Sequence, residues 1–213
     1  MRSLVVFGAV LIGVWAILVL VAITNGMVEN YISSAIESRL SHIQIHHPRF
    51  SENKELSYNL NDTAQLKEIL SNSPNIKQYT LRAVANAMIS TSHGVRGIEL
   101  FGIDKKQEAA ITNISSSVKE GNYFESDYKK PILLGKGLAE KLQLELGSKA
   151  VITLQDSSGS ITAAAYKVCG LFETGNTLLD ENLAYVRKKD FYENVNRQKL
   201  LHEAALLLKN RED

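Results

Sequence analysis

The chain opens with an apolar run and then changes to alternating apolar and polar positions. Residues 4–23 carry no charged side chain. As a helix with about 1.5 Å rise per residue, this run spans roughly 30 Å, the thickness of a bilayer's hydrocarbon core. It is longer than the apolar region of a secretory signal, and residues 21–26 make a poor cleavage site. The pattern predicts a transmembrane helix at residues 1–24. An uncleaved signal peptide and a buried helix of a soluble core are the alternatives.

Helical periodicity continues past this run. Apolar residues recur at every fourth position, with polar residues on the other face: Val28, Ile32, Ile36 and Leu40. Gly26 costs about 1 kcal/mol relative to Ala inside a helix, which is tolerable. We therefore expect an amphipathic stalk helix at residues 25–41 that extends the membrane helix. The four apolar residues are the expected packing face, against a partner or against the domain, and a separate helix docked on the domain is the alternative.

From residue 42 the pattern predicts short strands and helices. Period-two alternation indicates strands, and spacing of three and four indicates helices. The expected strands are 42–47, 77–91, 95–103, 151–155, 161–171, 183–186 and 202–208, and the expected helices are 61–73, one that ends near 142, and 189–196. Turn residues at His93-Gly94 and at 156–159 predict two hairpins. Asp62 or Thr63 is the expected cap of the first helix.

The charge balance changes the range of partners. Without Arg2, which precedes the apolar run, the chain has 23 basic and 23 acidic residues. Because binding to phosphate backbones needs a basic stripe, nucleic acid is not an expected partner.

Arg2 precedes the span and Glu29 is the first charge after it, so the positive-inside rule places the amino terminus in the cytoplasm.

Candidate metal and nucleophile chemistry is sparse. His42, His46 and His47 lie close together, but no neighbouring cysteine completes a zinc site, so the solvated face of an edge strand is preferred. Cys169 lies in an alternating run and is expected to be a buried small apolar residue. No catalytic, metal or cofactor-binding residue is predicted.

Motifs for nucleotide binding and hydrolysis are also missing. Gly135-Lys136-Gly137 precedes a short helix but lacks the order of the Walker motif. Serine hydrolase, zinc protease and dinucleotide fingerprints are absent, so an enzyme is not predicted. Asp104 and Glu120 are expected to be a capping carboxylate and a surface charge. The acceptor patterns at Asn61 and Asn113 are interpreted as turn and cap chemistry.

A set of short motifs in a fixed order resembles one family. It includes Gly102-Ile103-Asp104 before a helix, residues 120–124, 132–142 and 146–149, then 170–172 with Gly175, and 183–186. Their order behind a membrane helix resembles the extracytoplasmic domain of FtsX/MacB-type ABC transporter permeases. The histidine segment followed by Pro48 is most similar to the lipoprotein-releasing branch.

The resemblance implies an α+β fold in two lobes behind the stalk. A mixed α/β lobe, similar to the porter lobes of efflux pumps, would combine residues 42–103 with 178–213. A smaller, β-rich lobe would be inserted at residues 104–177. Since family members carry three further membrane helices and nothing between residues 25 and 213 could span again, we expect a truncated permease.

The resemblance also implies a function. The chain would be the membrane-anchored part of a permease in the bacterial inner membrane, with one pass in this chain and most residues outside. Its partners would be a separate cytoplasmic ATP-binding subunit, a second permease chain and membrane lipid, and its cargo lipoprotein, lipid or another amphipathic molecule. The alternative is a sensor or binding module anchored by a single span.

Overall fold

The computed structural model describes residues 2–35, 41–156, 159–196 and 199–209. The chain separates into two compact units, Met1–Ala35 and Ile36–Asp213. The first unit is a single helix, α1 (Arg2–Ala35), of 34 residues. It continues without a break past Gly26 into the first part of the predicted stalk.

The second unit contains a closed barrel. Its strands, in order around the barrel, are β2 (Ile76–Thr91), β3 (Gly94–Ile103), β8 (Leu183–Arg187), β5 (Pro131–Gly135), β7 (Ile161–Phe172) and β6 (Lys149–Gln155). Each strand pairs with the next, and β6 pairs back with β2 through the register Ala87↔Leu154 to Ser90↔Val151. Most neighbours are antiparallel, but β3–β8 and β5–β7 are parallel. Closure leaves few exposed sheet edges.

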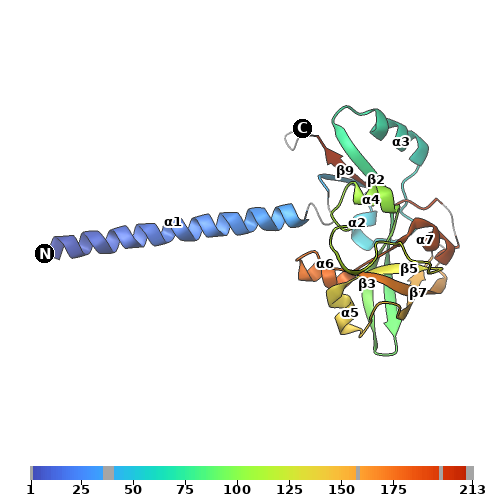
Figure 1. The fold of residues 1–213 in the computed structure, drawn as a ribbon. Helices are drawn as coiled ribbons and strands as arrows, with labels where there is room; N and C mark the ends of the chain where they lie inside the picture. Colours follow the sequence, from blue (N-terminus) through green and yellow to red (C-terminus); the bar gives the residue numbers. More distant parts are fainter. Residues whose placement is uncertain (1, 36–40, 157–158, 197–198, 210–213) are drawn as a thin grey trace. The chain divides into compact units, whose positions relative to one another are not determined.

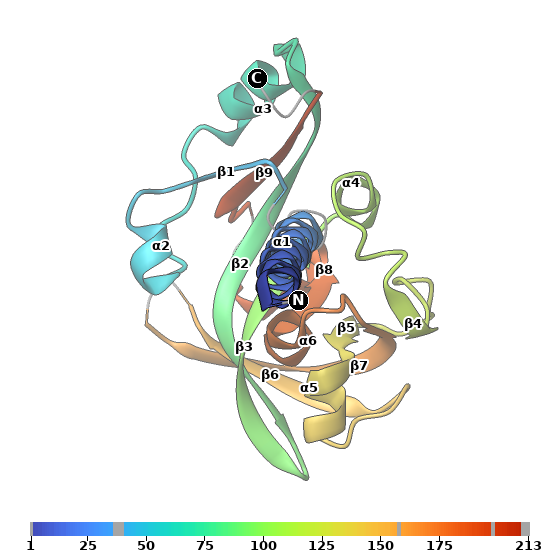
Figure 2. The same ribbon diagram turned by 90° about the vertical axis from the view of Figure 1, so that its left-hand side faces the viewer.

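The first half of β2 leaves the barrel and joins a second, smaller sheet. There β2 pairs with β9 (Glu203–Leu208), and β9 pairs with β1 (Ile43–His46). β1 is an edge strand, as the histidine segment predicts. Helix α3 (Thr63–Asn72) packs beside this sheet through Leu66 and Leu70. Figures 1 and 2 show β2 running through both parts, from α3 to the turn before β3.

Short helices complete the unit. They are α2 (Phe50–Asn53), α4 (Lys105–Ala109), α5 (Lys136–Lys141), α6 (Thr177–Asn182) and α7 (Lys188–Asn194). Strand β4 (Val118–Gly121) pairs with the end of β7. Side chains of α5 and α7 join the barrel core: Leu138 and Phe191 are fully buried there. The prediction of an α+β domain behind an apolar helix is confirmed.

The apolar residues predicted on one face of β2 are buried, but Thr80, Arg82 and Val84 between them are buried as well, so burial alternates only from Ala85 to Ile89. Leu81, Ala83, Ala85, Ala87 and Ile89 are all buried. Both predicted hairpins form, as β2–β3 and β6–β7. Helices α2 and α6 and strand β4 are not among the predicted elements, because elements of four to six residues are too short to show a period. Asp62 is the N-cap residue of α3, one of the two predicted positions, but its side chain forms no capping hydrogen bond.

The predicted two-lobe division is not confirmed by the sheet pairing. Within residues 104–177, β5 pairs with β8 and β6 pairs with β2, and both partners lie outside that segment. Residues 36–213 form one compact unit. The boundaries at 104 and 177 stay a prediction drawn from the resemblance.

Candidate functional site

Helix α1 has the length and composition of a membrane span. Residues Val6–Val28 form a 23-residue candidate span that contains an 18-residue window with a mean hydropathy of 2.9, and none of that window is buried. It is the one such helix among the described residues. A helix that is apolar on all sides needs an apolar environment around its whole circumference. A lipid bilayer is an environment of that kind.

The predicted packing face of the stalk is only partly described. Val28 lies in α1 with 53% of its surface exposed. Ile32 also lies within α1, whereas Ile36 and Leu40 lie outside the described residues. The packing partner of this face therefore stays a prediction.

The three histidines near β1 have separate contacts. His42 Nδ1 accepts a hydrogen bond from Leu208 N at 3.1 Å. His47 stacks on Tyr58, with ring centroids 5.2 Å apart. His46 lies in the edge strand, tilted against Phe50. Each of the three rings therefore has its own structural contact in or beside the small sheet.

A buried ionic cluster lies where β2 passes from the small sheet into the barrel. The Arg82 guanidinium is 1% exposed and donates to both Glu108 carboxylate oxygens, at 3.0 and 2.6 Å. It also donates to Glu203 Oε1 at 2.6 Å. Thr112 Oγ1 donates to Glu108 at 3.2 Å, and Gln44 donates to Glu203 at 3.4 Å. The cluster joins the small sheet, the barrel strand β2 and the α4 segment.

The electrostatics of the cluster favour the charged state. Burial by itself lowers the Arg82 pKa, but Glu108 and Glu203 outweigh burial, and the net shift raises it. Thr112 and Gln44 donate further hydrogen bonds to the two carboxylates, which adds partners for their buried oxygens. The predictions from sequence missed this cluster. Its one visible signal is a charged residue inside the alternating apolar strand at 77–91.

A buried histidine stands beside the cluster. His202 Nδ1 accepts a hydrogen bond from Val84 N at 3.1 Å, and Nε2 lies 3.3 Å from the Leu56 carbonyl. Phe50 stacks on its ring at 5.2 Å. Burial lowers the pKa of His202 to about 4, against the smaller opposite effect of the hydrogen bond to Leu56. The ring is neutral near pH 7, and both its nitrogens contact backbone groups. We therefore interpret His202 as a structural link between α2, β2 and β9 and not as a residue that acts on a substrate.

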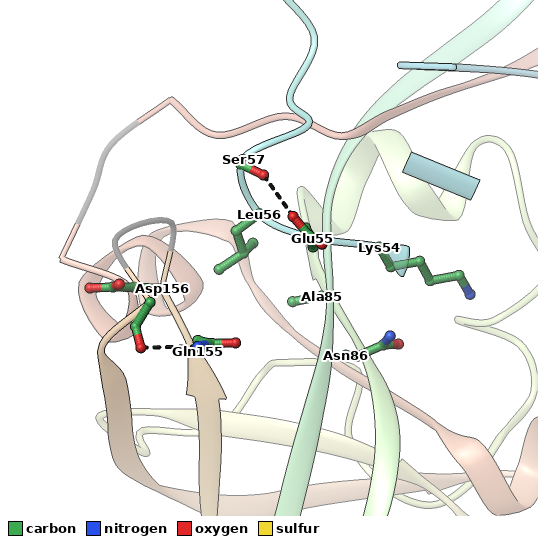
Figure 3. A pocket seen from close by; sticks show the side chains of 9 residues that line it. Lys54, Glu55, Leu56, Ser57, Ala85, Asn86, Gln155 and Asp156 are labelled. Carbon is green, nitrogen blue, oxygen red and sulfur yellow. Dashed lines mark hydrogen bonds between the residues drawn. The ribbon is translucent and has the colours of Figure 1, made fainter. Parts of the chain in front are cut away.

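A hollow of about 370 Å³ lies between α2 and the β6–β7 turn. It is lined by Lys54, Glu55, Leu56, Ser57, Ala85, Asn86, Gln155, Asp156 and Gly159 (Figure 3). Its polar groups bond to near neighbours: Ser57 to Glu55 at 3.3 Å, and Gln155 to the Gly159 carbonyl at 3.0 Å. Lys54 turns outward to Glu99, 2.7 Å away. The lining offers a polar surface, and its side chains are not arranged as a nucleophile with a base.

Two other candidate motifs have structural roles. Cys169 is 4% exposed, and burial raises its pKa to about 11, so the thiol is a poor nucleophile. This confirms the predicted buried residue. Asp104 caps α4 by accepting hydrogen bonds from Lys106 N and Gln107 N, as predicted. At Gly135, a Cβ would collide with the Asp180 carbonyl, so this glycine permits close packing of α5 on α6.

Comparisons with known proteins agree on one type of domain. The family described as the MacB-like periplasmic core domain matches residues 3–212. The lipoprotein-releasing system transmembrane protein LolC of Neisseria meningitidis serogroup B is 25% identical over 199 residues, covering 88% of this chain and 45% of LolC. The chain thus spans about half the length of this curated relative.

Among solved structures, the extracellular domain of the noncanonic ABC-type transporter YknZ from Gram-positive bacteria is similar. It has a TM-score of 0.53 and 16% identity, and the match covers 79% of this chain and 83% of the YknZ domain. The periplasmic region of MacB from Actinobacillus actinomycetemcomitans matches with a TM-score of 0.41 and 9% identity, covering 67% of this chain and 63% of that region. The likeness to YknZ shows a shared fold.

Proposed function

The chain belongs to the MacB-like periplasmic core domain family, and on this basis we propose that it is the membrane-anchored, extracytoplasmic part of an ABC transporter permease. Helix α1 crosses the bacterial inner membrane, with Arg2 on the cytoplasmic side and the folded unit outside. A separate cytoplasmic subunit hydrolyses ATP, and a second permease chain completes the assembly. The chain itself catalyses no reaction.

The observation that carries this proposal is the continuity of α1. The apolar segment ends at Val28, and the same helix continues to Ala35. An unbroken helix resists bending, so a displacement in the membrane is transmitted to the residues outside it. Rigid-body movement of an outer domain is an established form of switching. The face formed by Val28, Ile32, Ile36 and Leu40 is the surface through which we propose that the stalk contacts its partner.

The proposed cargo is lipoprotein, lipid or another amphipathic molecule. Support comes from the relative in Neisseria meningitidis, which is a transmembrane protein of the lipoprotein-releasing system. Helix α1 adds support, since a membrane-embedded permease meets such molecules in the bilayer where they reside. The outer unit would push on the cargo or regulate a partner as α1 moves.

The outer unit is built to move as one body. The Arg82 cluster and His202 fasten the small sheet to the barrel through buried polar contacts. Breaking such contacts leaves unpaired buried groups, which is costly. A displacement delivered at one strand would therefore move the other strands with it.

The proposal is tested by interrupting the stalk in the complete transporter, reconstituted in nanodiscs with its ATP-binding subunit. The insertion Gly-Gly-Ser-Gly-Gly-Ser-Gly after Ile32 makes the helix flexible. The matched control, Ala-Glu-Ala-Ala-Ala-Lys-Ala at the same point, keeps it helical and changes the phase by only about 20°. Lys119→Cys supplies a label on each permease chain, since Lys119 is exposed and the native Cys169 is buried.

The readout is the change in distance between the two labels when ATP is added. We expect this change with the parent and the helical insertion, and its loss with the flexible one. If the flexible insertion leaves the response intact, coupling through the stalk is wrong. If affinity purification from membranes yields no ATP-binding subunit, or yields a soluble chain cleaved near Ala22, the permease assignment itself fails.

A further inference from the structure

A basic hollow lies on the outer face of the barrel, away from the cavity of Figure 3. Its volume is about 620 Å³. Four of its lining residues are lysines, Lys129, Lys130, Lys149 and Lys167, and one is a carboxylate, Asp127. Among the described residues, Lys130 pairs with Glu193 at 3.4 Å, while Lys129 and Lys149 have no carboxylate within ion-pair distance. The hollow thus carries a net positive charge although the chain as a whole is nearly neutral.

The arrangement of two of these lysines is unfavourable in isolation. Lys149 on β6 and Lys167 on β7 are directly opposed in the strand register. Like charges at opposed positions destabilise a sheet. Lys167 Nζ lies over the Tyr128 ring, 4.2 Å from its centroid, which offsets part of this repulsion. An anion bound between Lys149 and Lys167 would reduce the repulsion that remains between them.

An open strand edge forms the floor of the same hollow. Strand β7 pairs with β6 along Ile161–Lys167, but its pairing with β5 begins only at Lys167. Lys167 N donates to the Lys130 carbonyl on the β5 side, and Val168 N donates to the Ser148 carbonyl on the β6 side. Successive residues of a strand direct their N–H and C=O groups to opposite edges. Ala163 and Ala165 lie an even number of positions from Lys167, so their N–H and C=O groups point away from β6, as those of Lys167 do.

This edge is accessible. Ala163 and Ala165 are exposed, and no strand among the described residues pairs with them on that side. Their side chains are small and leave room beside the backbone. At about 3.3 Å per residue, residues 161–166 offer roughly 20 Å of edge. Unpaired edges of this kind accept an additional strand.

We propose that this edge of β7 and the lysines beside it bind an extended, acidic segment of a protein partner. The segment would add a strand to β7 through main-chain hydrogen bonds at Ala163 and Ala165. Acidic side chains at alternate positions would face Lys149 and Lys167. This inference stands on the geometry of the barrel and is independent of the transporter assignment.

The lysines and the open edge of β7 together favour a peptide over a lipid headgroup. Lysines alone would attract any anion. The open N–H and C=O groups add donors and acceptors spaced for another backbone, and a headgroup cannot match that row. The occupant is therefore an acidic strand, and binding of anionic lipid becomes an outcome of the test.

The test uses the 213-residue chain in detergent and a synthetic octapeptide of alternating Thr and Glu. Binding is measured by fluorescence anisotropy at 50 mM salt, and amide hydrogen exchange is measured over residues 161–166. We expect saturable binding and slower exchange in this segment. A version of the peptide with alternate backbone amides N-methylated keeps its charge but loses its pairing, and we expect it to bind about tenfold more weakly.

Variants separate the contributions of charge and edge. Lys149→Gln with Lys167→Gln is expected to weaken binding at least about tenfold, whereas Lys106→Gln with Lys119→Gln removes two exposed charges elsewhere as the matched control. Ala163→Pro removes an N–H that the β6–β7 ladder does not use, and we expect about threefold to tenfold weaker binding. Ala163→Ser keeps that N–H and serves as its control.

Three results would overturn the proposal. One is equal affinity for the N-methylated and unmodified peptides, which would make the attraction purely electrostatic. Another is an equal loss of affinity in the control lysine pair. The third is tight binding to vesicles of phosphatidylcholine with 30% phosphatidylglycerol that depends on Lys149 and Lys167, together with no binding of the peptide.

Discussion

At the scale of single residues, Arg82 is the most consequential side chain in the folded unit. It is the largest of the fully buried described residues and is the one charged residue among the buried positions of β2. The position is tolerable because Glu108 and Glu203 both contact the guanidinium. Each partner lies on a different element, so the cluster depends on the complete fold.

We predict that Arg82→Met destabilises the outer unit by about 3–5 kcal/mol, because it leaves two buried carboxylates unpaired. Lys54→Met is the matched control, because the Lys54–Glu99 pair is more exposed and is expected to contribute about 1 kcal/mol or less. The free energy of unfolding in urea measures both effects. Similar losses for the two variants would show that burial of the Arg82 cluster is unimportant.

His202 is expected to make the stability of the unit depend on pH. Its pKa is about 4 in the folded state against the ordinary histidine value of 6.5, so the unfolded chain binds the proton more readily. The contribution of His202 is therefore complete above pH 6.5 and is lost as the pH falls toward 4, by about 3 kcal/mol.

The measurement is urea unfolding at pH 7.5 and pH 4.5. We expect His202→Gln to show a smaller loss of stability between these pH values than the parent protein. His93→Gln, in the exposed β2–β3 turn, is the control and should retain the loss seen in the parent. An unchanged pH dependence in His202→Gln would contradict the assignment.

At the scale of elements, close packing of α5 on α6 depends on glycine. Gly135 ends β5 directly before α5, and a Cβ there would enter the space of the Asp180 backbone carbonyl. Backbone cannot move aside as a flexible side chain can. Asp180 is also held in place, because its carboxylate accepts hydrogen bonds from Thr174 N and Oγ1.

We predict that Gly135→Ala costs about 1–3 kcal/mol through overpacking at this contact. Gly97→Ala on β3 is the control, because nothing lies within 4 Å of its added Cβ; it should be neutral or stabilising by a few tenths of a kcal/mol. The melting temperatures of the two variants, measured by thermal unfolding, test this prediction. Equal melting temperatures would mean that α5 and α6 adjust without strain.

At the scale of the whole molecule, helix α1 and the unit 36–213 are separate bodies. The hydrophobic clusters contain only residues of the second unit. The barrel and small sheet therefore hold their own core. The apolar window of α1 has no buried residue, so it contributes no residue to these clusters.

We predict that a fragment comprising residues 41–213 is monomeric and folded without detergent. It should unfold in one cooperative transition, within about 3 °C of the full chain in micelles, since the core is unchanged. Circular dichroism during heating measures this. Aggregation of the fragment, or separate transitions for the barrel and the small sheet, would contradict the prediction.

Local patterns in the sequence were sufficient for the elements that are long and regular. The apolar run of α1, the alternation along β2 and the turn residues of the two hairpins each lie within a short stretch of chain. Neighbouring residues alone determine such features, so the sequence predicts them without knowledge of distant contacts. Asp104 as a helix cap and Cys169 as a buried residue follow in the same way.

The closure of the barrel, the parallel pairing of β3 with β8 and the Arg82 cluster were decided by the tertiary structure. Arg82 and Glu203 are 121 residues apart, and no local pattern links them. The open edge of β7 is likewise defined by where β5 begins to pair. The sequence by itself determined which segments are apolar, alternating or capped, because those properties depend on adjacent residues. Only the fold decided which segments meet, because that choice minimises the free energy of the whole chain.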